Sequence, residues 1–101
     1  MELRVYSIYD SKAGAFNTPF FMATDELAIR AAKDTVSDKE TIFHRHPDDF
    51  VLYQVGVFNN TTGEVVGYSP ALHVVAFVQL VEQQPLPLLD NPEAEIRKIV
   101  P

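Results

Sequence analysis

The residues most able to do chemistry lie in one short segment, 44–49, which spells HRHPDD. Two histidines beside two carboxylates are donors that a zinc ion accepts. Histidines at i and i+2 point the same way only on an extended chain, and no third ligand is evident. We therefore interpret His44 and His46 as residues of an exposed polar loop, in which Pro47 and Asp48 turn the chain. No metal and no cofactor is expected.

Catalysis by the remaining polar residues is also not expected. Adjacent carboxylates such as Asp48 and Asp49 rarely converge on one substrate atom, so turn formation and capping explain them better. The chain has no Gly-rich phosphate loop, and none of its serines lies in a G-x-S-x-G elbow. The sequence therefore predicts a protein that is not an enzyme.

Binding of single-stranded nucleic acid is another function to consider, because such sites combine aromatic side chains for stacking with scattered basic groups. The net charge of −6 disfavours binding through bulk charge. That charge is uneven: residues 1–24 are neutral overall, whereas 25–49 and 50–101 each carry −3. The candidate nucleic-acid-binding residues are Arg4, Tyr6, Lys12 and Arg45.

Further aromatic residues on the expected strands could extend a stacking surface, and they are Tyr9, Phe20, Phe21 and Tyr53. Tyr6 and Tyr9 alternate onto opposite faces of one strand, so only one of them can belong to such a surface. The ordinary alternative is that these rings pack in the core.

The elements that must position these residues follow from hydrophobic periodicity. Alternating or β-branched runs predict strands over 3–9, 20–23, 50–58, 64–68 and 72–81. The last run, LHVVAFVQLV, is also compatible with a helix. NNTTG at 59–63 predicts a hairpin loop with a positive φ angle at Gly63.

One helix is expected from Asp25 to Val36. Thr24 is a suitable N-cap, and Asp25 and Glu26 place negative charge in the first turn, where the helix dipole favours it. Ala28 and Ala32 fall on one face at the spacing that packs against a sheet.

These elements predict an α+β fold: an antiparallel sheet of four to five strands, in the order β-β-α-β-β-β, with one helix on one face and a Pro-rich C-terminal tail. We expect a single domain over 1–82 and a tail over 83–101, in which AEIRKIV is compatible with a short helix. One helix covers one sheet face only, so the tail or a second subunit should cover the other. We therefore expect a homo-oligomer, in the simplest case a dimer.

Five blocks of sequence, in order over about residues 4–66, carry a resemblance to a known family. They include VYSIYD, PFF, the AIR of the helix, HPDDF-L and the G-F-N--TG hairpin. Together they resemble the small nonstructural protein of gokushoviruses, single-stranded-DNA phages of the Microviridae. The chain departs from the family pattern at Ala32, which is often aromatic, and in NNTTG, which usually carries aspartates.

The resemblance implies a role in single-stranded genome synthesis and packaging in the host cytoplasm, and it transfers no catalytic residue. Two hypotheses remain open. In one, the protein binds single-stranded DNA, weakly per subunit and cooperatively as an oligomer. In the other, it is an interaction module for a phage or host replication protein or a capsid-assembly protein, without DNA contact. No signal peptide or apolar run of membrane-spanning length is present, so no membrane association is expected. The absence of cysteine fits a reducing cytoplasm.

Overall fold

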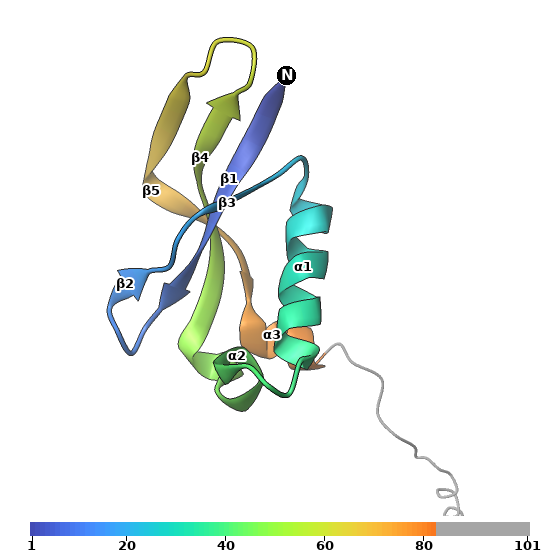
Figure 1. Cartoon of the computed structure of the whole chain (residues 1–101). Coiled ribbons are helices and arrows are strands. Elements are labelled where there is room, and N and C mark those ends of the chain that lie inside the picture. Colours follow the sequence, from blue (N-terminus) through green and yellow to red (C-terminus); the bar gives the residue numbers. More distant parts are fainter. Residues whose placement is uncertain (83–101) are drawn as a thin grey trace, which may run out of the picture.

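A curled antiparallel sheet with helices on one side forms the described part of the chain (Figure 1). The structure is a computed structural model that describes residues 1–82. The sheet has the order β2-β1-β4-β5, and β3 pairs with the same edge of β1 as β2. The strands are β1 (Glu2–Asp10), β2 (Ala15–Phe16), β3 (Phe20–Met22), β4 (Phe50–Asn59) and β5 (Val65–Ala76). This architecture confirms the predicted α+β class.

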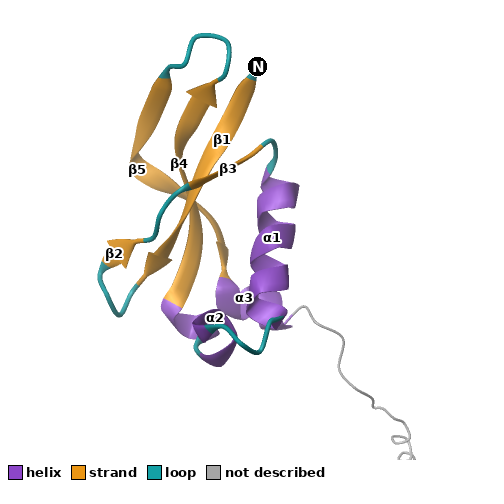
Figure 2. Ribbon diagram, viewed as in Figure 1, coloured by secondary structure: helices purple, strands orange, loops and turns teal. Residues whose placement is uncertain are grey.

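Helix α1 (Asp25–Ser37) lies against one face of the sheet (Figure 2). Its first turn is capped as predicted, because the Thr24 hydroxyl accepts a hydrogen bond from the Leu27 amide at 3.2 Å. Ala28, Ala32 and Val36 are its buried residues, one per turn. Small side chains at two of these positions let the helix backbone approach the sheet closely.

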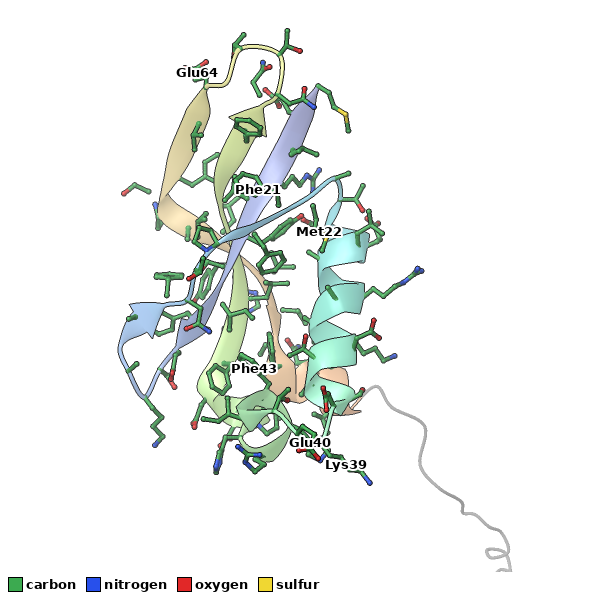
Figure 3. The ribbon with its side chains drawn as sticks, in the orientation of Figure 1. Phe21, Met22, Lys39, Glu40, Phe43 and Glu64 are labelled. Carbon is green, nitrogen blue, oxygen red and sulfur yellow. The ribbon has the colours of Figure 1, made fainter. Side chains whose placement is uncertain are left out.

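Three shorter elements close the lower end of the core: α2 (Ile42–Arg45), η1 (Pro47–Asp49) and α3 (Phe77–Glu82). Phe43 of α2 contacts Phe50 of β4 and Phe77 of α3, with ring centroids 4.6 and 5.5 Å apart. Figure 3 shows Phe43 between α2 and the end of the sheet. The expected polar connection is therefore partly helical, and one of its aromatic residues belongs to the core.

The final strand prediction is wrong in part. Strand β5 is one long strand over the two expected segments, and the chain then becomes helical at Phe77. Phe77 and Leu80 are both fully buried, as i, i+3 residues of a helix can be. The Ala76 amide donates to Gln79 Oε1 at 3.0 Å, which satisfies a backbone group at the start of the helix.

The β4–β5 hairpin is confirmed at its turn, where Gly63 has a φ of 80°. Further along, the ladder is irregular: Gly56 pairs with Gly67 and Gln54 with Leu72, so residues 68–71 stand opposite Val55 alone. Glycine is required at position 56, because a Cβ there would lie 2.3 Å from the Val66 carbonyl oxygen. This bulge in β5 shapes two hollows described below.

Candidate nucleic-acid interface

Tyr6 does not lie on a surface. Its side chain is fully buried in the core beneath α1, and its hydroxyl donates a 2.5 Å hydrogen bond to Asp25 Oδ1. Burial, followed by the bond to Asp25, raises the pKa of Tyr6 to about 12. An enclosed ring cannot stack on a base, so Tyr6 has to be removed from the predicted interface.

Arg4 is engaged at the same place, where its guanidinium lies 2.9 Å from Asp25 Oδ1. The hydrogen bond from Tyr6 is the main cause that lowers the pKa of Asp25, and Arg4 lowers it further. The carboxylate in turn raises the pKa of Arg4. The three side chains tie β1 to the first turn of α1, which is a structural role.

The other two predicted basic residues lie apart from this cluster. Lys12 is exposed in the turn between β1 and β2, where Asp10 Oδ1 accepts hydrogen bonds from the Lys12 and Ala13 amides at 2.9 and 3.2 Å. Arg45 is exposed at the last residue of α2. The structure therefore does not bring Arg4, Lys12 and Arg45 into one basic surface.

The two histidines of the candidate metal segment have separate positions. His44 Nδ1 donates to the Val36 carbonyl oxygen at 2.9 Å, which caps the C-terminal turn of α1. His46 precedes η1 and ends α2. Within residues 1–82, no three side chains of the metal-binding types gather at one point. Asp48 and Asp49 form the turn of η1, and the Asp49 carbonyl accepts from the Ser11 amide at 2.9 Å.

Aromatic rings gather instead on the sheet face opposite α1. Tyr53 is central: its ring centroid lies 6.3 Å from Tyr9, 5.6 Å from Phe16 and 5.8 Å from the ring of His73. Tyr9 and Phe16 are 5.0 Å apart. We call Tyr9, Phe16, Tyr53 and His73 the outer aromatic cluster. Phe16 is 48% exposed, so its ring is open to a ligand.

Local hydrogen bonds hold Phe16 in place. Strand β2 pairs Phe16 with Tyr9, and the following Asn17 amide donates to the Ile8 carbonyl at 2.8 Å. The buried Ser7 hydroxyl donates to the Asn17 carbonyl at 2.6 Å. An exposed ring on a backbone fixed in this way loses little freedom when it binds.

A hollow of about 510 Å³ adjoins this cluster. The bulge of β5 forms one wall, and the rings of the cluster form the other. Its lining is mostly apolar and consists of Tyr9, Phe16, Tyr53, Val55, Tyr68, Ser69, Pro70 and Ala71. A flat ring or an apolar side chain fits the chemistry of such a surface.

Charge is distributed unequally between the two sides of the molecule. Seven of the 14 acidic residues lie in the segment of α1, α2 and η1, namely Asp25, Glu26, Asp34, Asp38, Glu40, Asp48 and Asp49. The strand residues that share the face of the outer aromatic cluster carry no carboxylate: Val5, Ser7, Tyr9, Val51, Tyr53, Val55 and His73. This face therefore does not share the net negative charge of the chain.

The sequence predicts Tyr9 and Tyr53 as possible stacking residues, but it does not identify Phe16 and His73. Residues 72–81 alternate between the two faces of a predicted strand, so His73 is expected on the face opposite Leu72. This alternation could have identified His73 as a residue of the outer face. Phe16 follows the turn at Gly14, which has a φ of 67°, and the two-residue strand β2 is too short to show periodicity. The aromatic surface that is open to a ligand therefore lies on the face of β1 opposite Tyr6.

Comparison with known sequences assigns this chain to a family of phage proteins. Residues 3–80 match the family described as Phage ORF5 protein. The chain is also 39% identical over 67 residues to Protein ORF5 of Chlamydia phage 1, which covers 62% of this chain and 70% of that protein.

The chain belongs to the Phage ORF5 protein family of the Microviridae, which confirms the resemblance to gokushovirus proteins. No solved structure matches it. Among residues 1–82, no helix is long and apolar enough to cross a membrane.

Proposed function

We propose that this protein is a non-enzymatic binder of single-stranded DNA that acts in viral genome synthesis and packaging in the host cytoplasm. The observation that carries the proposal is the outer aromatic cluster: within residues 1–82, its rings lie on a sheet face that no helix covers (Figure 1), and the strand residues of that face bear no carboxylate. Membership of a family from single-stranded-DNA phages supplies the biological setting.

Stacking is the main interaction in this proposal. A base stacked on an aromatic side chain contributes about 1–3 kcal/mol, whatever its sequence. Phe16 offers a ring that is 48% exposed, and Tyr53 supports it from the centre of the sheet. Lys12, in the turn that leads into β2, is the basic residue placed to meet a phosphate.

Because few basic residues lie near the outer aromatic cluster, the affinity for DNA should depend only weakly on salt concentration. A protein that neutralises about one phosphate loses affinity with a log–log slope of roughly −0.7 on single strands, far shallower than a basic protein. Binding should therefore be weak per subunit and nearly insensitive to salt, and cooperative assembly would have to strengthen it.

A homo-oligomer, in the simplest case a dimer, is part of the proposal. Phe21 and Val65 are 49% and 62% exposed, and the ring of Phe21 lies 5.6 Å from that of Phe58. Figure 3 shows Phe21 over the sheet, whereas Met22 beside it points toward α1. Exposed apolar area of this kind favours association. Light scattering of the full chain tests it, and a monomeric mass at micromolar concentration would contradict it.

A second candidate function is an interaction module for a phage or host replication protein or a capsid-assembly protein, without DNA contact. The net charge of −6 and the scattered positions of Arg4, Lys12 and Arg45 favour this candidate. The same apolar face would then meet a protein surface rather than bases.

A binding assay with matched variants separates the two candidates. Phe16→Ser and Ile42→Ser remove apolar side chains of equal exposure, both 48%, one inside the outer aromatic cluster and one on α2. We expect Phe16→Ser to weaken binding of a fluorescent single-stranded oligonucleotide about ten-fold at low salt, and Ile42→Ser to change it little. If the wild-type protein shows no measurable binding at low salt, the interaction module is the correct function.

A further inference from the structure

Gln54 occupies an unusual position for an amide. It lies on β4 at the next inward-facing position after Phe50 and Leu52, two core residues, and is itself only 8% exposed. Its Nε2 donates to the Gly56 carbonyl at 3.1 Å and, over a long 3.5 Å, to the Tyr68 hydroxyl. Within the described residues, its Oε1 accepts no hydrogen bond. An unsatisfied buried acceptor costs about 1–3 kcal/mol, so a reason for keeping it is needed.

A second hollow, of about 390 Å³, adjoins this amide. Unlike the hollow at the outer aromatic cluster, it is mainly polar. It is lined by Glu2, Arg4, Ala23, Gln54, Val57 and Tyr68. Arg4 uses one terminal nitrogen for its ion pair with Asp25, and a guanidinium carries five donors in all. The hollow therefore combines an acceptor from Gln54 with donors from Arg4 and from the Tyr68 hydroxyl.

These groups define the ligand by its chemistry. The carboxylate of Glu2 disfavours a phosphate, and Oε1 of Gln54 requires a donor, so the hollow offers two acceptors. A neutral ring edge with an amino group beside an acceptor nitrogen meets these conditions, because one amino group carries two N–H donors. Cytosine and adenine present that edge. Thymine has a single ring N–H donor, and two carbonyl oxygens flank it, which the Glu2 carboxylate disfavours.

We propose that the hollow at Gln54 binds the edge of an unpaired amino-bearing nucleobase, and that it gives the protein a preference for cytosine and adenine over thymine. This inference rests on the proposed single-strand binding. Tyr68 lines both hollows, because the bulge of β5 lies at the edge of the sheet between them. One strand can therefore pass over this edge, with one base at the aromatic cluster and another at Gln54.

The test compares oligonucleotides of deoxycytidine and deoxythymidine of equal length, since both are pyrimidines with little self-stacking. The wild-type protein should bind the cytosine oligomer about ten-fold more tightly. Gln54→Leu should abolish this preference by weakening cytosine binding alone. The melting temperature should change little, because leucine removes the unsatisfied acceptor but also takes the Gln54 donor away from the Gly56 carbonyl. Gln79→Leu is the matched control: it removes an amide that caps α3 and should leave the preference intact.

Tyr68→Phe provides a second variant in case Gln54→Leu does not fold, and it should reduce the preference by removing one hydroxyl from the hollow. Equal binding of the two oligomers by the wild-type protein, a preference that survives in Gln54→Leu, or an undiminished preference in Tyr68→Phe would overturn the inference. The proposed single-strand binding would still hold after such a result if Phe16→Ser weakens the binding of both oligomers. If the wild-type protein binds neither oligomer, the proposed function fails as well.

Discussion

The two faces of this sheet are built from alternate residues of the same strands, yet they serve different purposes. On the inner face, Tyr6 and Leu52 are fully buried against α1 and α3. On the outer face, their neighbours Tyr9 and Tyr53 remain partly exposed and contact other rings. A strand can thus contribute to stability with one set of side chains and present a ligand surface with the other.

The largest expected difference between the faces comes from a charge placed on each. Leu52→Asp buries an unpaired carboxylate at a fully enclosed position, at a cost of several kcal/mol against a total stability of about 5–15. We expect this variant not to fold, as judged by circular dichroism. Val55→Asp lies on the same strand beside the outer hollow, is only partly buried, and should stay folded with a lower melting temperature. Equal damage from both changes would mean that the outer face is also a packed core.

High pH should destabilise the inner face through Tyr6. Its pKa is about 12 when folded and about 10 when unfolded, so the unfolded chain loses its proton first. Stability is therefore full below pH 10 and falls as the pH rises from 10 to 12, by roughly 2–3 kcal/mol. Urea unfolding at several pH values measures this loss. Tyr6→Phe should remove the Tyr6 part of it, and an unchanged alkaline profile in that variant would contradict the assignment.

Low pH acts on the partner of Tyr6. The pKa of Asp25 is lowered on folding, chiefly by the hydrogen bond from Tyr6. Its contribution is therefore present above the unfolded value near 4 and is lost as the pH falls through the folded value. Asp25→Asn should make acid unfolding less steep. An identical acid transition in Asp25→Asn would show that the carboxylate does not stabilise the junction of β1 and α1.

A smaller effect is expected at the end of α1. His44→Ala removes the hydrogen bond to the Val36 carbonyl and should cost about 1 kcal/mol, which lowers the melting temperature by roughly 4–8 °C. His46→Ala serves as the control and should change it little. Addition of a chelator to the wild type should have no effect. A fall in melting temperature with chelator would instead favour a metal at these histidines.

The parts of the fold set by local chemistry were predictable, and those set by contacts between distant segments were not. Thr24 and the acidic first turn predict α1, and Gly63 predicts the hairpin, because each requirement lies within a few residues. The run LHVVAFVQLV is apolar at both strand and helix spacing, and only the packing of Phe77 and Leu80 against α1 and β4 selects a helix for its second half.

The candidate site illustrates the same limit. Alternation shows that Tyr6 and Tyr9 face opposite ways, but it does not say which face the helix covers. That choice depends on where α1 docks, so the assignment of Tyr6 to the interface was wrong while Tyr9 remained available. The predicted position of residues 84–101 across a sheet face lies outside the described residues and stays a prediction.

The most direct measurement of the central claim is a titration of the isotope-labelled full chain with a single-stranded oligonucleotide, followed by backbone amide chemical shifts. We expect the shifts to concentrate at the outer aromatic cluster, in particular at Phe16, Tyr53 and His73. Residues 28–36 of α1, on the inner side, should change little. Shifts confined to α1 and α2, or no shifts at millimolar oligonucleotide, would contradict the claim that the outer sheet face binds single-stranded DNA.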